Sequence, residues 1–254
     1  MTLELTVVDS FTDRPFAGNP AAVAVVDRFP PDVRMQAVAA EMSLAETAFV
    51  ARRPDGEHDL RWFTPSVEVD LCGHATLAAA HVLGGSGCFH TRSGVLACTA
   101  GPSGRIEMDF PATPSAAADP PPDLTVDGVV WFGRGRFDVL LELPDADAVR
   151  SFVPDLARLA ALGGRAVVIT APGDADGIDC VSRVFGPNVG IPEDPVTGSA
   201  HCTLAVHWGE RLGRTELVGY QASPRGGTVH MRRRGDRVIL GGHAVTVSTV
   251  QMVA

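Results

Sequence analysis

The sequence predicts an α+β protein made of two similar lobes, with a small-molecule site in the cleft between them. Three observations carry this prediction. Short β-branched runs outnumber helical stretches, the chain repeats its own order of motifs, and a proline-rich segment separates the two copies. A cleft between lobes is the usual place for a small-molecule site.

The two copies of the repeat carry the same features in the same order. An aromatic-x-proline tripeptide is followed by an aspartate, a glycine turn, an apolar helical stretch and a pair of strands. The glycine turns are residues 73–75 and 198–200, and the helical stretches are residues 76–83 and 201–212. Because four features recur in one order, duplication is favoured over chance similarity.

The repeat predicts where the lobes begin and end. Residues 1–114 form the N-terminal lobe, completed by residues from about 244 to 254, and residues 123–243 form the C-terminal lobe. A linker covers about 111–122, where prolines remove backbone donors and small residues add little to a core. Further helices are expected at 32–40 and 155–162, and strands at 23–26, 167–170 and 245–250.

Composition excludes several classes of partner. The net charge is -9 and no long basic stripe is present, which argues against nucleic acid. No apolar run approaches the roughly 20 residues needed to cross a bilayer. Residues 1–9 read as a strand and lack the pattern of a signal peptide. The five cysteines are odd in number and form no CxxC, as expected in a reduced, cytoplasmic compartment.

The sequence contains no lysine, and all 21 basic residues are arginine. A lysine Schiff base, to a substrate or to pyridoxal phosphate, is therefore impossible in this sequence, and so is a Walker A loop. The glycine-rich stretches lack the GxGxxG spacing, and no GxSxG is present. The eight histidines show no HxxxH or HExxH, so no zinc site is expected. These absences close most of the common cofactor routes and give a metal site no support.

The two glycine turns are candidate anion-binding sites. Each is followed by a helix, and the first turn of a helix has unpaired N–H groups and a positive dipole end. A matched pair of such turns would suit a carboxylate, or the charge that develops beside one. The alternative is ordinary helix capping by Ser199 or Asp194.

Several side chains near these turns are candidates for proton transfer. Glu46 leads into an apolar strand, where a carboxylate loses solvation and can exchange a proton with carbon, or else it is an exposed residue at a helix end. Asp194 is a second candidate carboxylate, or else a turn residue. His74 is a candidate hydrogen-bond donor to substrate, or else a structural histidine. Cys72 and Cys202 lie beside the turns as candidate reactive thiols, although buried, inert cysteines are commoner.

The same segments resemble the PhzF family of phenazine-biosynthesis-like isomerases, over nearly the whole chain and in the right order. The EDPVTGSA segment at 193–200 is the strongest piece. The other matching segments are DSFT at 9–12, FAGNP at 16–20, ETAF at 46–49, FTP at 63–65 and CGHAT at 72–76.

The resemblance implies a diaminopimelate-epimerase-like fold, with two pseudo-symmetric lobes that each curl a mostly antiparallel sheet round a central helix. It also implies a homodimer without cofactor that isomerises a molecule like trans-2,3-dihydro-3-hydroxyanthranilate. The implied roles are general acid/base for Glu46, with His74 and Asp194 also in the catalytic group. The residues implied to bind substrate are Asn19, Gly73, Gly198, Ser199 and Ala200.

Two departures leave the substrate open. This chain has Cys72-Gly73-His74-Ala75 where the phenazine enzyme has a Gly-His-Pro segment. Cys72 also lies near one catalytic cysteine position of the related amino-acid epimerases, but the partner position falls in residues 197–199, which hold no thiol. An epimerase using Cys72 and a non-catalytic carboxylate-binding or scaffold protein are therefore kept as alternatives.

Overall fold

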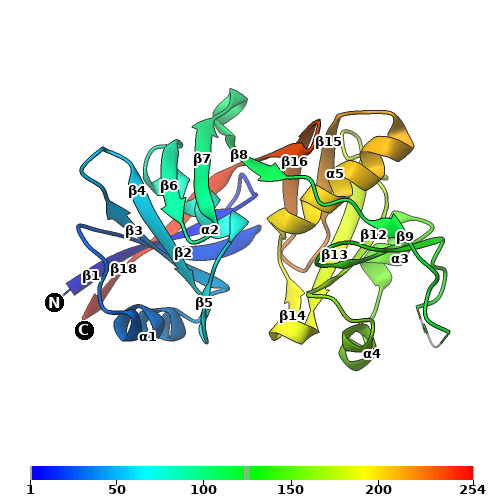
Figure 1. The fold of residues 1–254 in the computed structure, drawn as a ribbon, viewed down its shortest axis with the longest axis horizontal. Coiled ribbons are helices and arrows are strands. Elements are labelled where there is room, and N and C mark those ends of the chain that lie inside the picture. The colour runs from blue at the N-terminus through cyan, green and yellow to red at the C-terminus, as the bar shows by residue number, and fades with distance from the viewer. Residues whose placement is uncertain (1, 123, 125, 254) are drawn as a thin grey trace. The chain divides into compact units, whose positions relative to one another are not determined.

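The computed structural model of the protein describes residues 2–122, 124 and 126–253. The chain forms two compact units (Figure 1). The first comprises the residues up to Asp109 together with those from Gly241 onward, and the second runs from Phe110 to Leu240. The chain therefore leaves the first unit after more than a hundred residues and returns to it for its last strand.

The sheet of the first unit has mostly antiparallel pairings. Strand β1 pairs antiparallel with both β18 and β2, and the pairs β3–β4, β4–β5, β6–β7 and β7–β8 are antiparallel too. The pairs β2–β3 and β4–β6 are parallel. The strands are β1 (Thr2–Ser10), β2 (Asn19–Val26), β3 (Glu46–Arg52), β4 (His58–Phe63), β5 (Glu68–Val69), β6 (Gly87–Thr91), β7 (Gly94–Ala100), β8 (Ile106–Pro111) and β18 (Ala244–Val253).

The sheet of the second unit is built in the same way. The pairs β9–β10, β10–β11, β12–β13, β13–β14 and β15–β16 are antiparallel, whereas β11–β12 and β13–β15 are parallel. The strands are β9 (Ala116–Ala117), β10 (Trp131–Arg134), β11 (Val139–Glu142), β12 (Val167–Pro172), β13 (Cys180–Gly186), β14 (Ile191–Asp194), β15 (Glu216–Gln221), β16 (Gly227–Arg234) and β17 (Arg237–Gly242). Strand β9 lies within the segment expected to be a linker.

The pairing pattern confirms the predicted pseudo-symmetry of the two lobes. In the first unit β1 to β4, β6 and β7 pair as antiparallel, parallel, antiparallel, parallel, antiparallel. In the second unit β10 to β13, β15 and β16 pair in the same sequence of directions. Each unit also has a short strand, β5 or β14, directly before its main helix.

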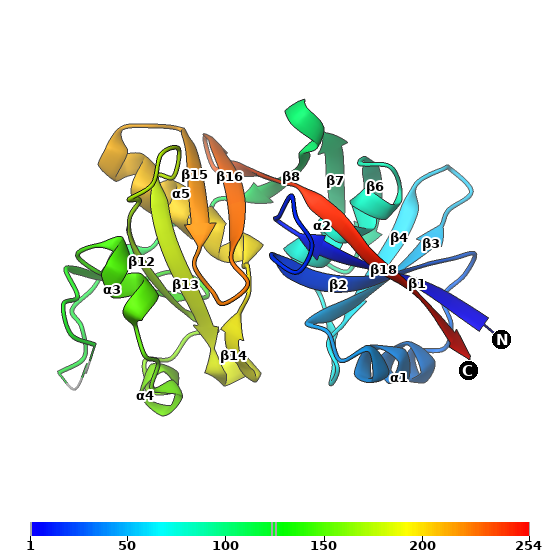
Figure 2. The same ribbon diagram turned by 180° about the vertical axis from the view of Figure 1, so that it is seen from behind.

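A helix packs against the strands of each unit. Helix α2 (Gly73–Val82) contacts β1, β2, β3 and β18, and α5 (Gly198–Leu212) contacts β15 and β16 (Figures 1 and 2). Every residue of α2 from His74 to Ala80 is buried. Its alanines favour the helix and are small enough for strands to approach closely. This arrangement confirms the predicted α+β class.

Both main helices begin three residues earlier than the sequence indicates. Gly73 and Gly198 are the first helical residues rather than members of a preceding turn, and neither has a positive φ. The extended residues before them, Cys72 and Thr197, mark the helix starts. A glycine in the first helical position tolerates helical φ and ψ as well as turn conformations, so the sequence pattern alone misplaces the boundary.

The remaining helices lie on the outside of the sheets. Helix α1 (Asp32–Met42) buries Met35, Val38 and Ala39, the spacing of one helical face. They pack on Phe49 and Phe63, whose rings meet edge to face at 5.6 Å between centroids. Helix α4 (Leu156–Ala161) confirms the helix expected at 155–162. Helix α3 (Ala146–Ser151) was not expected, although Asp145 caps it.

Across the described ranges 2–122, 124 and 126–253, no helix combines the length and apolar character needed to span a bilayer.

Candidate active site

Glu46 is the first residue of β3, and the end of helix α1 places it there. Ser43 ends that helix in the left-handed conformation, with φ of 51°, and its N–H donates to the Ala39 carbonyl. This reversal turns the chain back onto the sheet, where Glu46 pairs with Ala21 of β2. Only 12% of the Glu46 side chain is exposed, so the carboxylate is largely removed from water.

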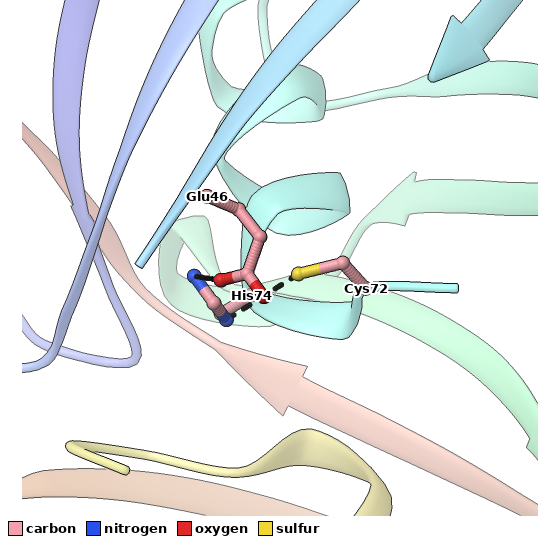
Figure 3. A group of neighbouring side chains, drawn as sticks. All are labelled: Glu46, Cys72 and His74. Atoms are coloured by element: carbon pink, nitrogen blue, oxygen red, sulfur yellow. Dashed lines mark hydrogen bonds and ion pairs between the residues drawn. The ribbon is translucent and has the colours of Figure 1, made fainter. Parts of the chain in front are cut away.

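The start of α2 places two further side chains beside this carboxylate. His74 Nε2 lies 3.1 Å from Glu46 Oε2, and His74 Nδ1 lies 3.5 Å from Cys72 Sγ (Figure 3). The His74 side chain is 7% exposed, and Cys72 is buried. The imidazole ring therefore stands between a carboxylate and a thiol, with one ring nitrogen toward each.

Burial and neighbouring groups shift the pKa values of Cys72 and His74. Burial raises the pKa of the Cys72 thiol, and the Glu46 carboxylate raises it further. Burial acts to lower the pKa of His74, but the neighbouring Cys72 and Glu46 outweigh burial and hold that pKa well above its ordinary value. The raised pKa favours the positively charged form of the imidazole, which faces the Glu46 carboxylate.

Hydrogen bonds from neighbouring elements hold the start of α2. Buried Ser10, at the end of β1, donates from its hydroxyl to the His74 carbonyl at 2.8 Å. Thr76 Oγ1 donates to the Cys72 carbonyl at 2.5 Å. Sequence reasoning assigned no role to Ser10. It lies in the DSFT segment at 9–12, which matched the family pattern but did not indicate a function for this serine.

Asn19 and Gly73 lie at the same end of the first unit's sheet. Asn19 is fully buried, begins β2 and pairs with Ser10 across the ladder. It stands two residues before Ala21, the partner of Glu46. Gly73 is the first helical residue between Cys72 and His74. The structure thus gathers the candidates of the first unit around one helix start and one strand end.

The candidates of the second unit gather at the start of α5. Asp194 ends β14, and its carboxylate accepts a hydrogen bond from Thr197 Oγ1 at 2.5 Å. The buried Gln221 side chain spans the same turn, donating to the Asp194 carbonyl at 2.6 Å and accepting from the Thr197 N–H at 2.9 Å. Gly198, Ser199 and Ala200 form the first turn of the helix.

An arginine that sequence reasoning missed holds the Ser199 hydroxyl. Arg165 donates to Ser199 Oγ at 2.9 Å from a terminal nitrogen that also contacts Asp138 at 2.6 Å. Arg165 Nε completes a two-pronged pair with the Asp138 carboxylate at 3.0 Å. Arg165 precedes β12 and Asp138 precedes β11, so no local motif signals their meeting with α5.

The starts of α2 and α5 are equivalent positions of the repeat. Cys72 and Thr197 are the extended residues before the helices, and neither side chain caps its helix. The fourth helical residue in each copy bonds back to that residue's carbonyl, from Thr76 Oγ1 in one and from His201 Nδ1 at 2.8 Å in the other. The N–H groups of both first turns are therefore not satisfied by N-cap side chains, as an anion site requires.

The position equivalent to Cys72 carries no thiol, as expected from sequence. Thr197 occupies it, and its hydroxyl donates to Asp194. The other thiol beside a helix start, Cys202, is 2% exposed and lies 3.8 Å from the Gly198 carbonyl. Cys72 is thus the thiol that contacts a second ionisable side chain at these helix starts.

Comparison with known proteins identifies the family. A family model described as phenazine biosynthesis-like protein, PhzC-PhzF, matches residues 8–250.

The chain belongs to this family.

Members of the PhzF family are similar to the chain along its full length. An uncharacterized isomerase of Halalkalibacterium halodurans is 44% identical over 97% of both chains. The crystal structure of a PhzF-family phenazine biosynthesis protein from Enterococcus faecalis is 39% identical, covers all of both chains and superposes with a TM-score of 0.94. A hydroxyproline epimerase from Agrobacterium vitis is 11% identical with a TM-score of 0.65, covering 98% of this chain and 92% of its own, and shares the fold alone. These likenesses confirm the expected family and the epimerase-like fold.

Proposed function

We propose that the chain is an isomerase that transfers a proton on a small carboxylate-bearing substrate without a cofactor. The observation that carries the proposal is the row of Glu46, His74 and Cys72, in which a shielded carboxylate is paired with a charged imidazole. Membership of a family whose relatives are named isomerases supports the same reaction class.

Glu46 acts as the base and then as the acid. Its carboxylate takes a proton from a carbon of the substrate, and the electron pair of that C–H bond moves into the adjacent unsaturated system. The carboxylic acid then returns the proton to a different carbon, so the substrate gains and loses nothing overall. The positive charge of His74 holds the carboxylate in one orientation while it is ionised.

Substrate binding is assigned to the helix starts. The backbone N–H groups at Gly73, Gly198, Ser199 and Ala200 suit the carboxylate of a substrate or the negative charge that develops beside it. Asp194 of the second unit and Asn19 of the first are the other polar residues assigned to substrate binding. A substrate similar to trans-2,3-dihydro-3-hydroxyanthranilate has the carboxylate, the acidic carbon and the conjugation that this scheme needs. A biosynthetic role, a cytoplasmic location and a homodimer belong to the same proposal.

The reaction can be followed by proton NMR of trans-2,3-dihydro-3-hydroxyanthranilate with the protein in D₂O. We expect the substrate signals to decay as deuterium enters the product, and Glu46→Gln to slow this by about 10²–10⁴-fold. Glu41→Gln is the matched control, because Glu41 is exposed on α1 and five residues away. Full turnover by Glu46→Gln would overturn the role of Glu46.

One observation favours a second candidate, an amino-acid epimerase that uses Cys72. The sulfur lies 3.5 Å from His74 Nδ1, and the charge and hydrogen bond of that ring favour the thiolate that this reaction would use. Exchange of Cα hydrogen for deuterium in a panel of amino acids, lost in Cys72→Ala but kept in Cys202→Ala, would select this reaction. If neither exchange nor isomerisation occurs but small carboxylates raise the melting temperature, the chain is a binding or scaffold protein.

A further inference from the structure

A second row of metal-capable side chains lies on the first unit, on strands β4 and β6. Glu57 directly precedes β4, and Cys88 and His90 flank the buried Phe89 on β6. Side chains alternate along a strand, so Cys88 and His90 share one face while Phe89 points to the other. His58 pairs with Phe89 in the parallel ladder, which puts Glu57 on the face of Cys88 and His90.

The three side chains meet at the Glu57 carboxylate. Glu57 Oε2 contacts His90 Nε2, and the Cys88 sulfur lies near the same carboxylate. Burial raises the pKa of this thiol, and the carboxylate raises it further. The sulfur, the ring nitrogen and a carboxylate oxygen all lie within 4.8 Å of one another. The Glu57 and His90 side chains are 40% and 32% exposed, so a solvent molecule can reach the point where the three donors converge.

The surroundings of this cluster carry an excess of negative charge. Asp55 lies in the turn before Glu57, and Asp59 pairs with His90 across the ladder. Arg53 is shared between the two aspartates, at 3.3 Å from Asp55 and 2.8 Å from Asp59. Three carboxylates therefore lie in this region with one arginine. The two aspartates pair with that arginine, and the Glu57 carboxylate contacts His90 and lies near the Cys88 sulfur.

We propose that Glu57, Cys88 and His90 bind a divalent transition-metal ion of the zinc class, with water as the fourth ligand. One thiolate, one imidazole and one carboxylate are the donors that such ions prefer, and tetrahedral zinc needs donors roughly 3.3–3.8 Å apart at metal–ligand distances of about 2.0–2.3 Å. The donor atoms lie within 4.8 Å of one another, so binding would need side-chain rotations that bring them to that spacing. Binding replaces the thiol proton of Cys88 by the metal and releases that proton to solvent.

The bound ion would join two segments that are distant in sequence. It would fasten the turn before β4 to β6, and would do so without using Glu46, Cys72 or His74. This inference is therefore independent of the proposed isomerase activity. It also explains why no metal motif appears in the sequence, since Glu57 is 31 residues before Cys88 and the ligands meet only through the strand ladder.

Cobalt(II) is the appropriate probe, because thiolate ligation produces a charge-transfer absorption in the near ultraviolet. We expect the metal-free native chain to take up one equivalent of Co²⁺ with this band, and Zn²⁺ to displace it. Cys88→Ala should abolish the band, and His90→Ala and Glu57→Gln should each weaken binding by at least about tenfold, since even partners outside the ligand shell contribute 10–100-fold.

Two cysteine variants serve as controls for the source of the band. Cys98→Ala removes a buried thiol on the neighbouring strand β7, and Cys72→Ala removes the thiol of the other metal-capable row, Glu46, Cys72 and His74. Both should keep the band. No thiolate band in the native chain, or a band that survives in Cys88→Ala and disappears in Cys72→Ala, would overturn the proposal.

Discussion

At the scale of single residues, the chemistry of the candidate active site depends on His74. Its ring touches the carboxylate of Glu46 on one side and the sulfur of Cys72 on the other. An uncharged ring would leave a largely buried carboxylate without a compensating charge, which is costly at low dielectric. The resemblance implied His74 and Glu46 as site residues, but only the structure shows that they act on each other.

The raised pKa of His74 predicts an alkaline limit to activity. The Glu46–His74 ion pair is intact below the raised pKa and is lost as pH rises through it, because the ring then gives up its proton. We expect kcat/KM to fall on the alkaline side in the native chain. His74→Gln should lower kcat/KM at neutral pH and remove this pH dependence.

The control for this profile is His81→Gln, at the far end of the same helix. Burial lowers the pKa of His81, and its ring contacts Thr246 rather than an acidic group. That variant should keep the native pH profile. An unchanged alkaline limb in His74→Gln would show that another group sets it.

At the scale of elements, the two helix starts are held by the same kind of side-chain hydrogen bond, made by different residues. Thr76 in α2 and His201 in α5 both donate to the carbonyl four residues earlier. The larger ring of His201 fits because Gly219 of β15 has no side chain; a Cβ there would lie 3.0 Å from the His201 ring. Its other nitrogen, Nε2, is buried and has no hydrogen-bond partner among the residues that the structure describes.

This buried ring makes α5 sensitive to acid. Burial lowers the pKa of His201 from 6.5 to about 4. Between these two values the histidine is protonated in the unfolded chain but stays neutral in the folded chain. Stability from the neutral ring is full above pH 6.5 and is lost as pH falls from 6.5 toward 4. The loss should reach about 3 kcal/mol in the free energy of unfolding.

Urea unfolding between pH 7.5 and 4.5 tests this prediction. His201→Thr copies the first repeat, and we expect its stability to depend less on pH than that of the native chain, whatever the cost of the smaller side chain at neutral pH. His243→Thr is the control and should retain the native dependence. Equal slopes for the native chain and His201→Thr would contradict the prediction.

At the scale of the whole molecule, the first unit is closed by the last strand of the chain. Strand β18 pairs with β1 from Ser10 opposite Ala244 to Thr2 opposite Val253. Because β1 ends at Ser10, which holds the His74 carbonyl, the chain end supports the active-site row without touching it.

Ending the chain after His243 should therefore unfold the first unit and abolish activity. The truncation leaves one side of β1 unpaired along its whole length. It also removes Val250 and Met252, and so exposes the apolar core of the first unit that these two side chains pack against. Circular dichroism melting and activity report the two effects. Thr249→Ala, at an exposed position of β18, should change neither, and a truncated chain with native melting and activity would refute the dependence.

Local patterns accounted for much of this architecture. Helix α1 follows from its apolar spacing, and α4 begins after the capping residue Asp155. The repeat predicted the pseudo-symmetry because each of its motifs lies within a short stretch. Helix α3 was not predicted, because six residues are too few to show a clear helical spacing of apolar residues. The starts of α2 and α5 were misplaced, since a glycine followed by small residues fits a turn and a helix equally well.

The sequence by itself determined the fold class, the family and the residues most worth testing, because these depend on order along the chain. Only the tertiary structure decided which side chains meet. The contact of Glu46 with His74, the hydrogen bond of Arg165 to Ser199 and the cluster of Glu57, Cys88 and His90 bring together side chains from different turns and strands. Strand register and helix placement bring these groups together, and both arise from burying the whole apolar core rather than from any local motif.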